Sequence, residues 1–185
     1  MFDLKKIKKA KKHLEEGGII LCPTDTIWGL SCDALNEKAV EEIFDIKRRP
    51  RVKKFLLLVN SYNMLEDYIG NVPEIILETM RSEYPITIIY PKAENLPSYL
   101  LANDGSIAIR ITKDKNLRKL ISFLGHPIVS TSANIGGEGY SKTFKDIDKS
   151  IIKSVDYILR LKDNKNNKPS KILKLEGDRF KVIRE

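Results

Sequence analysis

A cluster of hydroxyl, amide and glycine residues follows a short apolar run near the middle of the chain. The run is Pro127–Val129, and the cluster is Ser-Thr-Ser-Ala-Asn-Ile-Gly-Gly over residues 130–137. If the run is a strand, the cluster places donors and free backbone N–H groups at a strand end, where open α/β sheets bind ligands. Phosphate suits such a loop best. The alternative is an ordinary turn whose polar side chains bond to their own backbone, and the cluster alone does not decide between them.

Two further segments carry groups that could act on the same ligand. Pro-Thr-Asp-Thr-Ile-Trp-Gly-Leu at residues 23–30 offers two hydroxyls, a carboxylate and an aromatic ring; taken alone, it would be a turn with Trp28 in the core. Lys-Arg-Arg-Pro-Arg-Val-Lys-Lys at residues 47–54 has six positive charges in eight residues. A charge run is usually a solvated face, but Arg and Lys at a helix end can also hold phosphate oxygens.

Several familiar catalytic motifs are absent from the sequence. There is no Gly-x-x-x-x-Gly-Lys-Ser/Thr loop and no strand-linked Gly-x-Gly-x-x-Gly fingerprint, which excludes an ordinary P-loop enzyme and a dinucleotide-binding dehydrogenase. His126 has no evident Ser or Cys partner, so a His-dependent nucleophilic triad is not expected. Cys22 and Cys32 form no Cys-x-x-Cys pair, so we expect no zinc site.

The charge balance favours an anionic ligand or partner. Lys and Arg outnumber Asp and Glu by 33 to 25, giving a formal charge of +8, which favours nucleic acid or nucleotide phosphates. Much of the excess lies at residues 5–12, where the helical spacing favours a solvated helix face over an RNA-binding patch. No apolar stretch approaches the roughly 18 residues of a membrane span, and the N-terminus lacks an apolar signal core. We therefore expect a cytoplasmic protein without a membrane segment.

The elements that must position these residues alternate between helix and strand. Helical patterns occur at about residues 4–16, 37–48, 62–69, 73–81 and 114–123. Strand-like runs occur at 19–22, 55–59, 86–90, 106–110, 127–129 and 157–159, with a terminal pair around the turn at 176–178. With 185 residues, 42% of them hydrophobic, the chain can build one core. We predict a single domain, residues 1–185, of α/β (α+β) class: a twisted mixed sheet with flanking helices.

The order and separation of these motifs resemble the YrdC family of L-threonylcarbamoyladenylate synthases in its single-domain form, without the C-terminal extension of longer relatives. The matching segments are residues 23–30, Lys47-x-Arg49-Pro50, 107–110, 130–134, 169–173 and 182–184. The Lys-x-Arg and Ser-x-Asn motifs are specific in combination and weak separately. Two departures are Trp28, where Tyr is usual, and Leu58, where some members carry a histidine near threonine.

The resemblance implies a fold and a reaction. The fold is YrdC/RibB-like, with a basic concave face that holds the nucleotide. L-threonine, bicarbonate or CO2, and ATP with Mg2+ give threonylcarbamoyl-AMP, pyrophosphate and water. The product feeds N6-threonylcarbamoylation of adenosine 37 in tRNA (t6A), so a t6A transferase machinery is the implied partner.

The resemblance also implies roles for individual residues. The catalytic positions are Lys47, Arg49, Ser132 and Asn134. The ATP-binding positions are Lys47, Arg49, Lys53, Ser106, Asn134, Lys142 and Arg184, with Lys47 and Arg49 neutralising the triphosphate. The threonine-binding positions are Thr26, Arg110, Ser132 and Ser170, with Arg110 meeting the carboxylate. No residue ligates metal, because Mg2+ is held through the ATP phosphates.

Other functions remain open from the sequence. One is a non-catalytic module that binds double-stranded RNA or tRNA, or acts in ribosome maturation, through the basic surface; it would bind with steep salt dependence and gain little from ATP. Another is a carbamoyl-transfer domain of hydrogenase maturation, which usually sits within a much larger chain. For the synthase, the polar run at 162–168 is predicted to be a mobile loop and is the candidate that gates release of the intermediate.

Overall fold

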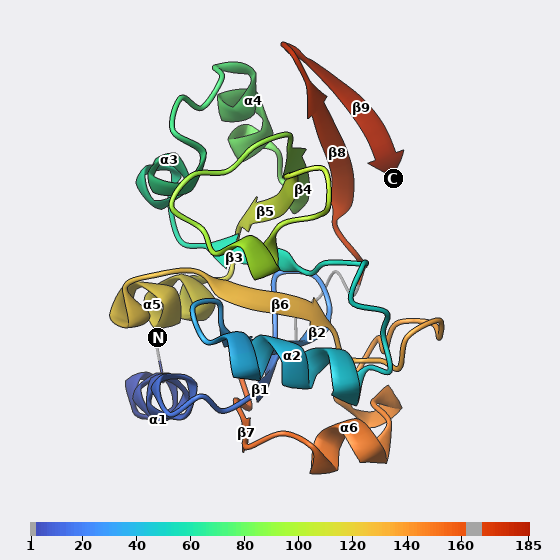
Figure 1. Cartoon of the computed structure of the whole chain (residues 1–185). Coiled ribbons are helices and arrows are strands. Elements are labelled where there is room, and N and C mark those ends of the chain that lie inside the picture. The colour runs from blue at the N-terminus through green and yellow to red at the C-terminus, as the bar shows by residue number, and fades with distance from the viewer. Residues whose placement is uncertain (1–2, 162–167) are drawn as a thin grey trace.

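One mixed sheet runs through the part of the chain that the computed structural model describes, residues 3–161 and 168–185 (Figure 1). All but the last residue of the predicted loop at 162–168 lies outside the described residues. The strands described are β1 (Ile20–Pro23), β2 (Trp28–Asp33), β3 (Leu56–Val59), β4 (Ile86–Tyr90), β5 (Ile107–Ile111), β6 (Ile128–Ser132), β7 (Tyr157–Ile158), β8 (Lys171–Glu176) and β9 (Arg179–Arg184). Their order is β7-β1-β2-β6-β3-β5-β4-β8-β9. Three pairs, β1–β7, β3–β5 and β4–β8, are parallel and the other pairs are antiparallel, which confirms the predicted mixed sheet.

Five of the six helices in the described part of the chain begin after a residue whose side chain caps them. The six helices are α1 (Leu4–Glu15), α2 (Glu37–Ile46), α3 (Tyr62–Ile69), α4 (Ile75–Arg81), α5 (Lys115–Leu124) and α6 (Lys149–Lys153), and α4 is the exception. Asn36 accepts a hydrogen bond from Ala39 N at the start of α2, and Asp114 accepts from Leu117 N at the start of α5. The first five helices are confirmed. Helix α6 was not predicted, because five residues are too few to show a helical period. In the described part of the chain, no helix is long and apolar enough to cross a membrane.

Strand β2 was also not predicted, because Pro23 and Gly29 make its surroundings look like a turn. The chain reverses at residues 24–27 and continues as β2, which pairs with β1 through Cys22 and Gly29. Gly29 is therefore a strand residue. A Cβ there would lie 3.1 Å from Thr131 O, so the glycine allows β6 to approach closely. In the same way, β6 extends through Ser132, and the residues predicted to open a polar loop after residue 129 are strand residues instead.

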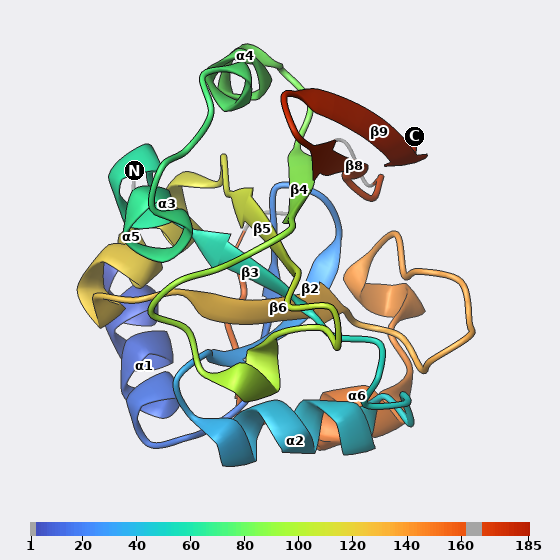
Figure 2. The ribbon, with the colours of Figure 1, turned by 45° about the horizontal axis from the view of Figure 1, so that its top comes forward.

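The two faces of the sheet are covered unequally. Alternation along β3 sends Leu57 and Val59 into a large core with α2, α3, α4 and α6. Leu58 faces the other way, into a smaller core with α1 and α5. These two helices lie side by side over one part of that face, as Figure 2 shows. Residues on the rest of this face line a cavity.

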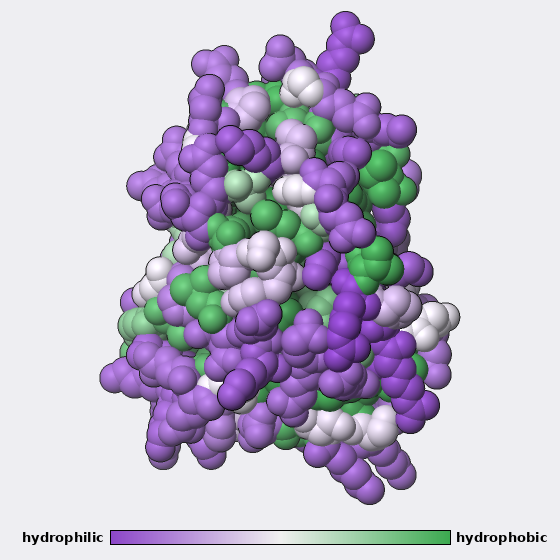
Figure 3. Space-filling model, in the orientation of Figure 1, coloured by the Kyte–Doolittle hydropathy of each residue, from purple (hydrophilic) through white to green (hydrophobic). Residues whose placement is uncertain are grey.

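The view in Figure 3 shows a mainly hydrophilic surface in which polar side chains interrupt the apolar ones. This is the pattern expected of a chain with 31% charged residues.

Candidate active site

A cavity of about 470 Å³ opens on the face of the sheet that α1 and α5 leave uncovered. This volume lies within the range of small-molecule sites, about 300–1,000 Å³. Its floor crosses four strands, because Leu56 of β3 pairs with both Ser130 of β6 and Ala108 of β5, and Ala108 pairs with Ile89 of β4. The site therefore lies on a face of the sheet. The residue 130–137 cluster was expected to form a binding loop at a strand end; its first three residues belong to β6, and Ser132 and Asn134, at and just after the end of that strand, line the cavity.

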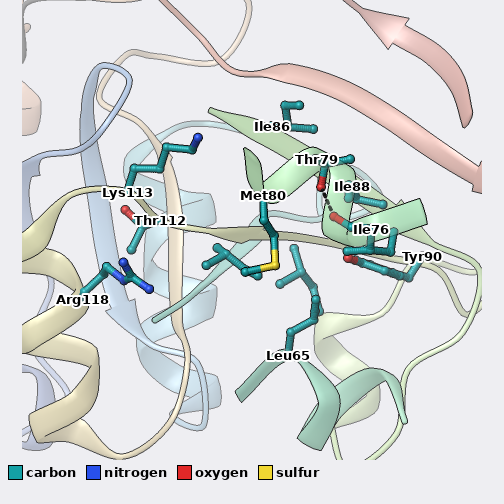
Figure 4. A pocket seen from close by; sticks show the side chains of 12 residues that line it. Leu65, Ile76, Thr79, Met80, Ile86, Ile88, Tyr90, Thr112, Lys113 and Arg118 are labelled. Atoms are coloured by element: carbon teal, nitrogen blue, oxygen red, sulfur yellow. Dashed lines mark hydrogen bonds between the residues drawn. The ribbon is translucent and has the colours of Figure 1, made fainter. Parts of the chain in front are cut away.

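A second, smaller cavity of about 130 Å³ lies against the opposite face of β5, toward α3 and α4 (Figure 4). Its walls are mainly apolar and include Leu65, Ile76, Met80 and Ile88. None of the residues assigned to the site from the sequence lines it among the residues described. The larger cavity, which the motif residues do line, is therefore the candidate active site.

The larger cavity brings together most of the residues that the sequence assigned to the site. The lining includes Thr26, Arg49, Arg110, Ser132, Asn134, Ser170 and Arg184. Lys47, Lys53, Ser106 and Lys142 are not among the described lining residues. Residues as far apart as 26 and 184 thus meet in one site, which the sheet order makes possible.

Lys47 lies behind the cavity wall, where its side chain is 1% exposed. Its Nζ donates to Ser132 O at 2.5 Å, to Asn134 O at 2.6 Å and to Asn134 Oδ1 at 3.4 Å. An ammonium group has three N–H donors, so these acceptors account for all of them. Burial, with a smaller contribution from Arg49, lowers the pKa of Lys47 to about 8. This placement differs from the expected contact with the triphosphate.

The Lys-x-Arg and Ser-x-Asn motifs are locked to each other by further bonds. Gly136 N donates to Lys47 O at 2.7 Å, and a Cβ on Gly136 would lie 3.0 Å from that oxygen. The Asn134 side chain donates to Ile135 O at 3.0 Å and to Glu138 O at 2.7 Å. The glycine thus allows the two segments to touch, and Asn134 holds the loop that follows β6.

Arg49 and Lys54, in the segment that leads into β3, bring positive charge to one end of the cavity. Arg49 is held by its own loop, because Nε donates to Lys53 O at 2.8 Å and Nη2 donates to Lys54 O at 3.2 Å. Its guanidinium lies 5.3 Å from the centre of the Phe55 ring. Burial lowers the pKa of Arg49, which still leaves it cationic. This end therefore suits phosphate oxygens.

A second pair of cations, Arg110 and Arg184, lies toward the other end. Strands β3 and β5 run in parallel, and Leu56 of β3 lies opposite Ala108 of β5. Lys54 comes two residues before Leu56 and Arg110 comes two residues after Ala108, so the two cations lie on opposite sides of this pair. Arg184 donates from Nε and Nη2 to Ser170 O at 3.1 and 2.8 Å. Burial and the charge of Arg110 lower the pKa of Arg184. Two guanidinium groups that line the same cavity and influence each other's charge favour an anionic ligand such as a carboxylate.

Hydroxyl groups surround this second pair of cations. Arg110 Nη2 donates to Thr26 Oγ1 at 3.3 Å, and Thr26 Oγ1 shares a hydrogen bond with Thr24 Oγ1 at 2.8 Å. Ser170 Oγ shares a hydrogen bond of 2.8 Å with Thr87 Oγ1. The threonine-binding positions assigned from the sequence are thus gathered at one end, except Ser132, which lines the cavity from β6.

Three predicted ATP-binding residues lie elsewhere. Lys53 and Lys142 have exposed side chains. Ser106 Oγ donates to Asp104 Oδ1 at 2.6 Å. Leu58, at the family's histidine position, is fully buried in the core beneath α1 and α5.

Sequence reasoning also missed residues that line the cavity, among them Lys54, Thr87, Glu138 and Tyr140. Lys54 could have been proposed from the charge run at 47–54, and Thr87 from its match to a family segment, whereas Glu138 and Tyr140 stand in segments without a distinctive pattern.

Comparison with known proteins identifies the family of this chain. The family model Sua5_yciO_yrdC, described as Telomere recombination, matches residues 12–185. A putative threonylcarbamoyl-AMP synthase of Methanocaldococcus jannaschii is 38% identical over 177 residues, which are 95% of this chain and 83% of that protein. A threonylcarbamoyl-AMP synthase of Pseudoalteromonas translucida is 32% identical over 176 residues, which are 93% of this chain and 94% of that protein.

A solved structure shares the fold. P. abyssi Sua5, in its crystal structure complexed with L-threonine, matches with a TM-score of 0.82 and 27% identity over 91% of this chain. This chain spans 50% of that Sua5 chain. The resemblance drawn from the motifs is confirmed: the chain belongs to the Sua5/YciO/YrdC family.

Proposed function

We propose that this chain is an L-threonylcarbamoyladenylate synthase, a nucleotidyltransferase. It would form threonylcarbamoyl-AMP, pyrophosphate and water from L-threonine, bicarbonate or CO2, and ATP, for t6A synthesis in tRNA. The observation that carries the proposal is a single cavity with Arg49 and Lys54 toward one end and Arg110 and Arg184 toward the other. Relatives named threonylcarbamoyl-AMP synthase and a Sua5 structure with L-threonine support it.

The reaction divides into two steps. First, the threonine amine adds to CO2 and loses a proton, so that an N–C bond forms and a carbamate results; when bicarbonate is the source, water is released. A carbamate oxygen then attacks the α-phosphorus of ATP, the new P–O bond forms, and the bond to the β-phosphate oxygen breaks with release of pyrophosphate. All the reacting groups are anionic or become so, and the catalyst must therefore position them and offset their repulsion.

The residues divide between these tasks. Arg110 would pair with the threonine carboxylate, with Thr26, Ser170 and Arg184 around it. Arg49 and Lys54 would hold the phosphates from the opposite end.

Ser132 and Asn134 would face the junction between the two substrates, because they line the cavity from the end of β6. Lys47 supports this junction from behind by binding their carbonyl oxygens. Lys53, Ser106 and Lys142 would contact only parts of the nucleotide that project from the cavity.

Mg2+ would accompany ATP. The described residues contain no group of three or more His, Cys, Asp or Glu side chains that could hold a metal ion, and Glu138 is the one carboxylate residue among the described lining residues. This donor set fits a Mg2+ held mainly by phosphate oxygens. When bound, the ion would share the negative charge of the phosphates with Arg49 and Lys54.

We also propose that residues 1–185 act as one YrdC-like domain and pass the intermediate to a t6A transferase machinery. The RNA-binding module without chemistry is not favoured, because the relatives described above are named as synthases. Direct binding of tRNA would be an additional property.

The proposal is tested by following pyrophosphate release and the mass of the adenylate product. Purified protein is mixed with ATP, Mg2+ and bicarbonate, and each amino acid is added in turn, with no RNA present. We expect release to depend on both L-threonine and bicarbonate, with a product of the mass of threonylcarbamoyl-AMP. Equal release without threonine would contradict the proposal.

A further inference from the structure

Asp25 is a buried carboxylate between two lining residues, in the turn that connects β1 and β2. It is 6% exposed and is not among the described residues that line the cavity. Its Oδ1 lies 3.1 Å from Nη2 of Arg110, whose side chain is 4% exposed. Its Oδ2 accepts a hydrogen bond of 2.8 Å from the backbone N–H of Lys113, two residues beyond the end of β5. The carboxylate is therefore fixed by the same segment that carries Arg110.

The guanidinium of Arg110 is only partly engaged by the protein. Nη2 contacts Asp25 and donates to Thr26 Oγ1 at 3.3 Å. The buried Nε has no hydrogen-bond partner among the described residues. Asp25 Oδ1 likewise accepts no hydrogen bond among the described residues, although it lies within ion-pair distance of Arg110. The attraction between the two side chains is therefore Coulombic. It does not use two guanidinium donors, as a bidentate pair would. A buried donor without an acceptor is costly. Arg110 also lines the cavity, so an anionic ligand bound there would supply acceptors for the donors of the guanidinium that face it.

We propose that Asp25 is a positioning residue, which holds the guanidinium of Arg110 in the orientation in which it meets the substrate carboxylate from the cavity wall. The inference rests on the proposed function, since the carboxylate is that of L-threonine. Asp25 contacts Arg110 and is not itself among the described residues that line the cavity. It also offsets one positive charge where Arg110 and Arg184 lie close enough for the charge of one to lower the pKa of the other. An isolated buried guanidinium beside a second one would otherwise be driven toward solvent.

The test is a double-mutant cycle on the binding of L-threonine to the full chain, measured by calorimetry. The variants are Asp25→Asn, Arg110→Met and the two combined. Asn keeps the size of Asp25 and an oxygen for Lys113 N–H but removes the charge. We expect Asp25→Asn to weaken threonine binding by about tenfold, the value of one charge-assisted hydrogen bond. The affinity for ATP should change less than about twofold, because the phosphate end is untouched.

The combined variant separates positioning from direct contact. If Asp25 acts only through Arg110, adding Asp25→Asn to Arg110→Met causes no further loss of threonine affinity. The combined variant also leaves neither charge buried alone, so it stays informative if Asp25→Asn by itself unfolds. Asp156→Asn is the matched control, because Asp156 also accepts a backbone N–H, that of Ile19 at 2.7 Å, but lies outside the cavity lining.

A spectroscopic measurement reports on Arg110 directly. The Nε–H resonance of Arg110 in a ¹⁵N-labelled chain should shift and exchange faster with water in Asp25→Asn, and should be unchanged in Asp156→Asn. The inference is overturned if this resonance is unchanged in Asp25→Asn. It is also overturned if Asp25→Asn binds threonine as the wild type does, or if the losses of the two single variants add in the combined variant. If the wild-type chain does not bind threonine, the proposed function fails instead, and the resonance still tests the hold of Asp25 on Arg110.

Discussion

Lys47 and Arg110 are both buried cations at the same site, Lys47 behind the cavity wall and Arg110 in it, and they differ in how many of their donors the protein uses. Lys47 is 1% exposed and gives all three ammonium protons to oxygens of residues 132 and 134. Arg110 is 4% exposed and keeps a buried N–H without a partner among the described residues. Charge and burial are alike in the two. Lys47 has no donor left for a ligand, whereas Arg110 lines the cavity with a guanidinium whose donors the protein uses only in part.

The largest expected effect follows from removing the donors of Lys47. Lys47→Met leaves three oxygen atoms without their donor, and each buried acceptor left unpaired costs about 1–3 kcal/mol. We expect the free energy of unfolding to fall by about 3 kcal/mol or more, measured by urea denaturation. Pyrophosphate release should fall at least about a hundredfold because the loop that carries Ser132 and Asn134 is released.

Arg48→Met is the matched control, since Arg48 is exposed and outside the cavity lining. A Lys47→Met variant that keeps wild-type stability and loses only ATP affinity would contradict the scaffold role of Lys47. Lys47 would then be a phosphate ligand, as the sequence had indicated.

The pKa of Lys47 gives a second test of the same contrast. Burial lowers it to about 8, below the ordinary lysine value of about 10.5 that applies to the unfolded chain. Between these two values the unfolded chain binds more protons at this site, so the free energy of unfolding rises with pH. At roughly 1.4 kcal/mol per pH unit, the gain is about 3 kcal/mol.

We expect the wild type to gain this amount over Lys47→Met between about pH 8 and 10.5, in urea denaturation at a series of pH values. A difference that does not change with pH would mean that the three oxygen acceptors hold Lys47 in its charged form.

In contrast to Lys47, a change at Arg110 should alter the KM for one substrate and have little effect on the stability of the fold. Arg110→Lys keeps a positive charge beside Asp25 but loses the planar fork that matches a carboxylate. We expect the KM for L-threonine to rise about thirtyfold, with the KM for ATP within about twofold. Steady-state kinetics with each substrate varied would measure this. An equal rise in both KM values would show that Arg110 supports the whole site rather than threonine.

The sequence predicted which residues meet better than it predicted how they are held. Thr26, Arg49 and Ser170 could be assigned because their motifs keep their order and separation, and the sheet brings those segments together. That the site lies on a face of the sheet depends on how far α1 and α5 extend over it, a long-range packing outcome.

Burial and bonding partners are equally hidden in a sequence. Lys47 and Arg49 stand in one charged run, yet the first is enclosed by the loop after β6 and the second lines the cavity. The role proposed for Asp25 is hidden in the same way, because it depends on the contact with Arg110, which lies 85 residues away in the chain. Residue type predicts the available chemistry, and only the packing assigns each donor to the scaffold or to a ligand.

The smallest expected effect concerns the phosphate end, where the cation is partly exposed. Arg49 keeps its place through two backbone oxygens, so Arg49→Gln should leave the fold intact and weaken only the attraction for phosphate. We expect the KM for ATP to rise about tenfold and the KM for threonine to stay within about twofold. Arg51→Gln is the control, since Arg51 pairs with Glu41 and Asp45 outside the cavity lining. If Arg49→Gln instead raised the KM for threonine, the two ends of the cavity would not divide the substrates as their cations indicate.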